Sequence, residues 1–312
     1  MKFGLFIDKC SQESFYINDG KSYRFDNTPF ITQNSIENYT HMSIFQYPFL
    51  FGNDGYFINL KNTPLPDIDF DIIFLVRERF FSEFTTQLIR SKYPNAKIFG
   101  VLKEQYGVDE KLRSAALAEC DEILLPFKHK FIHYQYQQLT GKRTTWLPQP
   151  YDIDFLYDKF YKEVRTEDIF SYVSPTLPKL RRANTETFTA YISKKYNLTV
   201  KRVLTNNWTD FLESISTCKF IFNLDPIQAA GQTGVQSAIL GLAAIGGSSD
   251  SYINLYPSTY GTNFDYLEEE FVKLNSNVEL YTEYIQNSFN KVNEIYGIAS
   301  VKNKILSMYY EK

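Results

Sequence analysis

Residues 219–249, KFIFNLDPIQAAGQTGVQSAILGLAAIGGSS, decide the fold class of this chain. The run 219–224 is mostly apolar, and a second apolar run covers 242–246. Short runs of this kind between turn residues are typical of buried strands. A glycine-containing loop and a helix-forming stretch lie between them. Strand, loop, helix and strand in this order predict a parallel αβ unit.

The same alternation extends outward from this stretch over most of the chain. Residues 8–70 are less regular, and their turn signals predict strands and loops there rather than long helices. The final ~35 residues have helical apolar spacing. Further strands are expected at 2–7, 72–76, 97–102, 122–126, 169–173 and 199–203, and further helices at 80–92, 109–119, 184–195 and 208–216. Strands alternating with helices predict an α/β protein with parallel sheets.

The length of 312 residues favours two domains. The segment 146–152 holds two prolines, which resist helix, and it marks the expected boundary. We therefore expect an N-terminal Rossmann-like domain over 1–150 and a C-terminal one over 151–290. Residues 291–312 are expected to form a helix that packs back on the N-terminal domain.

Composition excludes some classes of protein. Hydrophobic residues make up 44% of the chain, so a large core can form, and the composition disfavours disorder. The net charge of −3 disfavours a surface that coats nucleic acid, although one basic patch can coexist with it. Three widely spaced cysteines suit a reducing compartment. Without a signal-like start or a long apolar run, we expect a cytoplasmic protein with no transmembrane segment.

The loop that opens at Gly231 is the first candidate binding site. Thr233 and Gln236 have the spacing of a capping box, which predicts a helix start at this point. The free amides of that helix start would hold a diphosphate, with Gly231 and Gly234 allowing close backbone approach. The alternative is that the glycines only permit tight packing between a helix and the sheet.

Asp225 follows the strand 219–224, and Gln232 lies in the same loop. The carboxyl ends of parallel strands are where such sheets bind ligands, so both side chains are candidates for donor contact.

A second candidate site is the cationic segment that follows the strand 169–173. Lys179, Arg181 and Arg182 are expected on a loop that leads into a helix. Arginine offers bidentate donors to phosphate and lysine a point charge, so the three can neutralise a departing diphosphate. A solvated basic loop is the alternative.

The residues 234–238 and 241–247 resemble the corresponding segments of GT-B glycosyltransferases. In many of these proteins the helix begins with a carboxylate that binds the donor, and a second carboxylate follows eight positions on; this chain has Gln236 and Ala244 there. The resemblance implies two Rossmann-like domains facing a cleft, with a nucleotide sugar, expected to be UDP-linked, on the C-terminal one and no metal cofactor. The implied donor-binding residues are Lys179, Arg181, Arg182, Asp225, Gly231, Gln232, Thr233, Gly234 and Gln236.

The resemblance also implies that the N-terminal domain binds the acceptor. Asp8 and Glu104 follow the strands 2–7 and 97–102, at the expected ligand edge of the sheet. Either carboxylate is a candidate general base toward an acceptor hydroxyl. His129 and His133 have the spacing of metal ligands on a helix, but Lys128 beside them disfavours a metal, and none is expected.

Three functions remain open at this point. The leading one is a glycosyltransferase whose acceptor is a glycan, a lipid, a protein, a small molecule or a modified DNA base. The second is a non-catalytic nucleotide- or sugar-binding protein of the same architecture, motivated by Gln236 and Ala244. The third is a nucleotide-dependent epimerase or another two-domain enzyme, because a fold does not fix a function.

Overall fold

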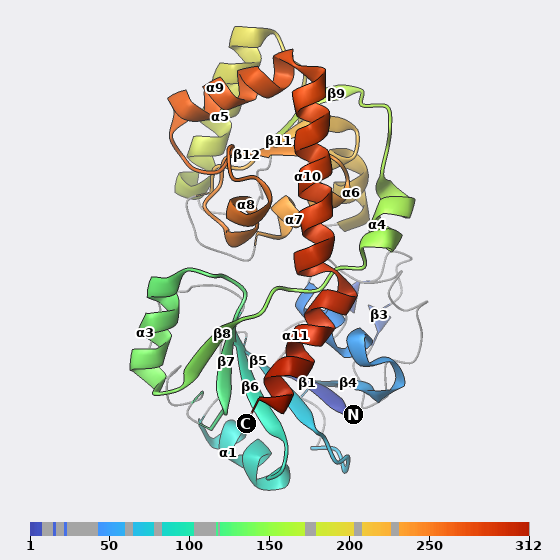
Figure 1. The fold of residues 1–312 in the computed structure, drawn as a ribbon, viewed down its shortest axis with the longest axis vertical. Helices are drawn as coiled ribbons and strands as arrows, with labels where there is room; N and C mark the ends of the chain where they lie inside the picture. Colours follow the sequence, from blue (N-terminus) through green and yellow to red (C-terminus); the bar gives the residue numbers. More distant parts are fainter. Residues whose placement is uncertain are drawn as a thin grey trace. The chain divides into compact units, whose positions relative to one another are not determined.

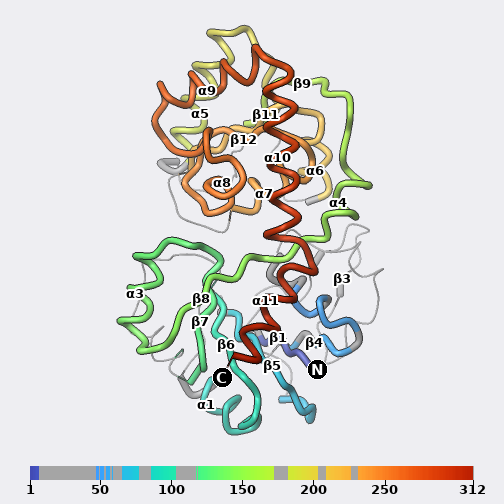
Figure 2. Tube along the Cα trace, viewed as in Figure 1, coloured from blue at the N-terminus to red at the C-terminus, as the bar shows by residue number. Residues whose placement is uncertain are grey.

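The computed structural model describes residues 1–7, 15–16, 22–23, 43–59, 65–77, 83–102, 117, 119–171, 179–202, 208–225 and 231–311. Its ribbon is drawn in Figure 1 and its Cα trace in Figure 2. The chain divides into two compact units. Unit 1 comprises Met1–Tyr151 with Ile298–Lys312, and unit 2 comprises Asp152–Gly297.

Unit 1 is built on a six-stranded sheet whose paired strands are all parallel. In spatial order the strands are β4 (Gly55–Asn59), β1 (Phe3–Ile7), β5 (Ile72–Arg77), β6 (Lys97–Leu102), β7 (Glu122–Leu125) and β8 (Arg143–Trp146). A separate antiparallel pair joins β2 (Phe15–Tyr16) to β3 (Ser22–Tyr23). Phe3 pairs with Gly55 on one side and with Ile72 on the other, so β1 is an interior strand.

Helices cover both faces of this sheet, as its continuous apolar strands require. On one face the 3-10 segment η2 (Ser43–Asp54) and α11 (Ile298–Tyr310) pack on side chains such as Phe74 and Phe99. On the other face α1 (Glu83–Lys92) and α3 (Lys130–Thr140) pack on side chains such as Ile73 and Ile98. The core of unit 1 therefore has two apolar layers.

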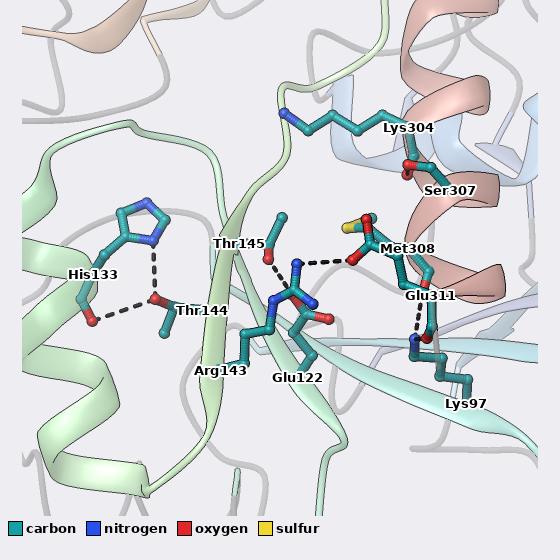
Figure 3. A network of polar contacts seen from close by, with 10 residues as sticks. All are labelled: Lys97, Glu122, His133, Arg143, Thr144, Thr145, Lys304, Ser307, Met308 and Glu311. Atoms are coloured by element: carbon teal, nitrogen blue, oxygen red, sulfur yellow. Dashed lines mark hydrogen bonds and ion pairs between the residues drawn. The ribbon is translucent and has the colours of Figure 1, made fainter.

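Polar contacts hold the C-terminal helix α11 against the starts of the strands. The Nζ of Lys97, the first residue of β6, donates to the carbonyl oxygen of Met308. Arg143, the first residue of β8, lies with Nη2 2.9 Å from Oε2 of Glu311 and with Nε 3.5 Å from Oε1 of Glu122. Figure 3 shows these contacts. The end of the chain is thus an integral part of unit 1.

Unit 2 contains a four-stranded parallel sheet in the spatial order β10 (Val200–Lys201), β9 (Glu167–Ser171), β11 (Cys218–Phe222) and β12 (Ala243–Ile245). Its helices are α4 (Ile153–Phe160), α5 (Lys179–Tyr196), α6 (Trp208–Ile215), α7 (Gln232–Ile239), α8 (Asp250–Leu255), α9 (Phe264–Ser276) and α10 (Val278–Tyr296). Helices α5 and α9 bury Phe188 and Phe271 against Phe222 of β11.

Side chains at the helix starts explain several boundaries. Asp152 accepts a hydrogen bond from the amide of Phe155 at the start of α4, at 3.2 Å. Asn277 accepts from the amide of Leu280 at the start of α10, at 3.0 Å. Such caps satisfy amides that have no partner within the helix.

The expected α/β class with two parallel sheets is confirmed. Every strand expected from the sequence after residue 70 has a counterpart, and so do the helices expected at 80–92, 208–216 and over the last part of the chain. Most of the expected helix at 109–119 falls outside the described residues. Strand β8 and the helices α3, α4, α8 and α9 were not predicted. None of the helices in the described part of the chain has the length and hydropathy that a membrane crossing requires.

Candidate functional site

The strand order of unit 2 marks a point where a ligand can bind. From β9 the chain moves outward to β10 and then returns past β9 to β11. The strands that follow β9 and β11 in the chain therefore lie on opposite sides of this adjacent pair. In open parallel sheets, ligands bind in the crevice that such a switch of direction opens. In this unit the switch lies at Ser171 and Asn223.

Hydrogen bonds fix the middle of α5 to this edge. The amide of Leu224 donates to Thr185 Oγ1 at 2.8 Å, and Ser171 Oγ lies 3.1 Å from Thr189 Oγ1. All of these atoms are buried. The spacing of Thr185 and Thr189 places both hydroxyls on one face of α5. Sequence reasoning missed this pair, although two threonines four residues apart in a helix were a visible signal.

The three predicted cations lie in the first turn of α5. The helix begins at Lys179, so the expectation of a loop over 179–182 is wrong. Only the backbone of Lys179 and Arg181 is described. Arg182 is partly buried, and its Nε is shielded from solvent without a hydrogen-bond partner among the described residues.

The first turn of a helix carries a partial positive charge and favours acidic side chains. The first turn of α5 contains none. A helix start with no acidic side chain is compatible with the predicted anion site, whose role stays a prediction.

At the start of α7, the second predicted site, the N-cap residue differs from the predicted one. The helix begins at Gln232, and Gly231 is its N-cap residue with φ 74° and no side-chain cap. Thr233 and Gln236 both lie inside the helix and are buried, so the capping-box prediction is wrong. A left-handed N-cap requires glycine here because a side chain would be strained.

The glycines of this loop pack against α8. A Cβ at Gly231 would overlap the hydroxyl oxygens of Ser249 and Ser251. A Cβ at Gly234 would lie 2.5 Å from Ser251 Oγ and 3.0 Å from the ring of Tyr252. Close packing is therefore one use of both glycines, here between two helices rather than between helix and sheet.

The residues that follow β12 also lie at the carboxyl edge of the unit 2 sheet. Gly246 and Gly247 have φ values of 91° and 87°, which let the chain turn sharply there. Ser248 Oγ then donates to the carbonyl oxygen of Asp225 at 3.1 Å, while the amide of Asp225 donates to Asn223 Oδ1 at 3.2 Å. Asp225 is thus held at the ligand edge, partly exposed.

The two positions that lack the family's carboxylates have different environments. Ala244 lies in the middle of β12 and is fully buried. Gln236 is 3% exposed on α7. A charge at either position would be withdrawn from water, which is costly without a partner.

In unit 1, the predicted catalytic residues Asp8 and Glu104 lie outside the described residues. The strands that precede them, β1 and β6, are the two neighbours of β5, so their carboxyl ends share one edge. The roles of both carboxylates stay predictions.

The histidine pair has a structural explanation. His133 Nε2 lies 2.8 Å from the carbonyl oxygen of Phe127, and its Nδ1 lies 3.0 Å from Thr144 Oγ1. A carbonyl only accepts, so Nε2 donates to Phe127. Both ring nitrogens are engaged, while His129 is the exposed N-cap residue of α3. The described residues contain no cluster of metal-ligating side chains.

Comparison with solved structures identifies the architecture. A glycosyltransferase from Rickettsia africae aligns over 99% of this chain and 98% of its own, with a TM-score of 0.62 and 10% identity. Sucrose-phosphate synthase from Thermosynechococcus elongatus aligns over 99% and 98%, with a TM-score of 0.59 and 10% identity. The chain has the GT-B glycosyltransferase fold.

A third GT-B structure of similar length carries ligands. It is an alpha-glucosyltransferase in complex with UDP and a 13-mer DNA that contains an HMU base. It covers 100% of both chains, with a TM-score of 0.57 and 9% identity. No protein-family model and no curated protein sequence matches this chain. At these identities the likeness establishes the fold alone.

Proposed function

We propose that this chain is a glycosyltransferase that takes a sugar from a nucleotide-sugar donor held by unit 2. The observation that carries the proposal is the first turn of α5, where Lys179, Arg181 and Arg182 lie at the carboxyl ends of β9 and β11. The Nε of Arg182 has no hydrogen-bond partner among the described residues, and in the proposed complex a diphosphate oxygen would accept from it. The GT-B architecture supports glycosyl transfer as the reaction.

In the proposed reaction an acceptor hydroxyl oxygen attacks the anomeric carbon of the donor sugar. The bond between that carbon and the diphosphate breaks, and the nucleoside diphosphate leaves with the electron pair. Charge grows on the leaving oxygen, where the α5 cations and the amides at the start of α7 would stabilise it. Asp8 or Glu104 would take the proton of the acceptor hydroxyl. The rest of the donor site would come from Asp225, Gly231, Gln232, Thr233, Gly234 and Gln236.

The proposed donor is UDP-linked, and the reaction as proposed uses no metal. The neighbouring structure with UDP and DNA supports UDP as the first nucleotide to test and keeps a modified DNA base among the possible acceptors. A glycan, a lipid, a protein and a small molecule remain the others. The proposed location is the cytoplasm.

The donor site is tested by the thermal stability of the purified protein with UDP and other nucleoside diphosphates. We expect UDP to raise the melting temperature, because a ligand that binds only the folded state stabilises it. Arg182→Ala should weaken UDP binding by roughly 10- to 100-fold, the equivalent of one lost charged hydrogen bond.

Lys194→Ala is the matched control. It removes one cation from the exposed last turn of the same helix. The two variants change the net charge equally, so a general charge effect would weaken UDP binding in both. We expect only Arg182→Ala to weaken it, because only Arg182 lies in the proposed site. Equal effects of both variants, or the absence of any nucleotide effect, would contradict the proposed donor site.

A second candidate is a non-catalytic nucleotide- or sugar-binding protein, favoured by the absence of carboxylates at Gln236 and Ala244. The release of UDP from nucleotide sugars separates the two functions. A protein that binds UDP but releases none from several donors, with and without glycan, lipid and DNA acceptors, would favour the binding protein.

A further inference from the structure

Two aromatic side chains on the outer face of α3 are open to solvent. Phe131 is 66% exposed and Tyr134 is 58% exposed. They lie three residues apart in the helix, so both rings are on one face. Among the phenylalanines whose burial the structure describes, Phe131 alone is exposed. Single exposed apolar residues are ordinary, but two aromatic rings one turn apart form a patch that a partner can cover.

The opposite face of α3 fixes the helix on unit 1. Ile132 and Tyr136 are buried in the core of that unit. His133 Nε2 donates to the carbonyl oxygen of Phe127, and Figure 3 shows the same side chain beside Thr144 of β8. Figure 1 shows α3 next to this edge strand. Because these contacts occupy the inner face, the two exposed rings cannot turn inward without breaking them.

The patch lies in a positive segment of a chain whose net charge is −3. Residues 123–151, which contain α3, include no aspartate or glutamate. Lys130 is exposed, directly precedes Phe131 and lies one turn before Tyr134 on the same face. Lys142 follows the C-cap of α3 and is partly exposed. The patch therefore combines apolar rings with positive charge.

Other exposed apolar side chains lie beside acidic residues instead. Val278 is 79% exposed at the start of α10 and is followed by Glu279. Tyr266 is 41% exposed in the first turn of α9 and is preceded by Asp265. These positions offer exposed apolar groups without the positive surroundings of α3, which makes them suitable controls.

The chemistry of the patch favours an anionic lipid bilayer as the partner. Aromatic side chains on one face of a helix enter the boundary between headgroups and acyl chains, and lysines beside them attract anionic headgroups. A second copy of this chain fits less well, because two such faces would bring like charges together. Single-stranded nucleic acid also fits less well, because its binding needs cations along the whole backbone path, and Lys130 is the only cation within α3.

We propose that the face of α3 formed by Lys130, Phe131 and Tyr134 docks on the surface of an anionic lipid bilayer. The rings of Phe131 and Tyr134 enter the interfacial layer, with the tyrosine hydroxyl directed to the headgroups. The ammonium group of Lys130 lies at the level of the anionic headgroups. The inference uses no donor residue, so it is independent of the proposed function.

Binding of the purified protein to sedimented vesicles tests this surface. The vesicles contain phosphatidylcholine alone or with about 30% phosphatidylserine, which supplies the anionic surface. We expect the wild type to partition onto the anionic vesicles. Phe131→Ser and Tyr134→Ser should each lower the partition coefficient at least about fivefold, because each removes a ring from the interfacial layer. Lys130→Gln should lower it about fivefold on anionic vesicles and leave binding to phosphatidylcholine unchanged.

Phe131→Trp provides a second readout. It should retain binding, because tryptophan is favoured at the membrane interface, and its added emission should shift to shorter wavelength when anionic vesicles are present. Val278→Ser and Lys194→Gln are the matched controls, since they remove an exposed apolar group and an exposed cation from unit 2. Each should change the partition coefficient less than twofold.

The proposal is overturned if the wild type stays in solution with anionic vesicles, if Phe131→Ser binds as the wild type does, or if Val278→Ser causes an equal loss. Sedimentation without lipid checks the other two occupants. A dimer that Phe131→Ser dissociates, or a complex with a single-stranded oligonucleotide that the same change abolishes, would overturn the bilayer as the partner of this face.

Discussion

Replacing Gly231 with alanine should lower the free energy of unfolding for two separate reasons. The first is conformational, because the residue has φ 74°, and a left-handed backbone costs a residue with a Cβ roughly 1–2 kcal/mol. The second is steric, because the new Cβ would overlap the hydroxyls of Ser249 and Ser251. Overpacking of this kind typically costs about 1–3 kcal/mol. We therefore expect Gly231→Ala to lower the free energy of unfolding by about 2–5 kcal/mol.

Gly141 calibrates the conformational cost alone. It has φ 66°, and a Cβ there would have no atom within 4 Å. Gly141→Ala should therefore cost only about 1–2 kcal/mol. Urea unfolding, followed by circular dichroism, measures both variants. Equal losses in the two variants would refute the packing argument. A Gly231→Ala protein of normal stability that no longer binds UDP would show instead that the glycine serves backbone approach to the phosphates.

Three further predictions concern stability. Arg165→Ala should cost about 3–5 kcal/mol in urea unfolding, since its partly buried guanidinium donates to the carbonyl groups that end α6 and α7. Arg165→Lys should recover only part of the loss. Burial raises the pKa of Asp168, but hydrogen bonds from Thr199 and Lys219 outweigh it and hold the pKa below its ordinary value. The wild type should therefore be more stable than Asp168→Asn at neutral pH, and this difference in the free energy of unfolding should disappear as the pH falls through the lowered pKa. Ile305→Ala should destabilise unit 1 by about 2–5 kcal/mol, because this fully buried side chain of α11 lies in its core; an unchanged urea midpoint would contradict the assignment of α11 to that unit.

The strands could be predicted because their apolar runs are buried on both faces, so the pattern alone specifies them. The run 97–102, for example, is β6 with the bounds the sequence suggested. The start of α5 was placed five residues too late, because the prolines at 175 and 178 and the charges that follow were interpreted as a loop. Proline is tolerated directly before or within a first helical turn, so Pro178 was in fact compatible with a helix that begins at Lys179.

The candidate site was less predictable because its contacts join segments that are distant in sequence. The hydrogen bond from the amide of Leu224 to Thr185 spans 39 residues. The packing of Gly231 against Ser251 depends on α8, which the sequence pattern did not reveal. Local spacing gave a wrong prediction at Thr233 and Gln236, because the capping-box pattern starts at the second residue of a helix whose N-cap is the left-handed Gly231.

The missing carboxylates therefore weigh differently on the proposed function than the sequence alone suggested. Ala244 is inside β12 with no exposure, so a carboxylate there could not reach the ligand edge. At Gln236, which is buried, a neutral amide avoids the cost of burying a charge. Neither substitution removes a donor from the first turn of α5 or from the amides at the start of α7. In the proposed function, recognition of the diphosphate can therefore persist while recognition of the sugar changes. We expect this chain to differ from GT-B enzymes that keep both carboxylates in its selectivity for the donor sugar rather than in nucleotide binding.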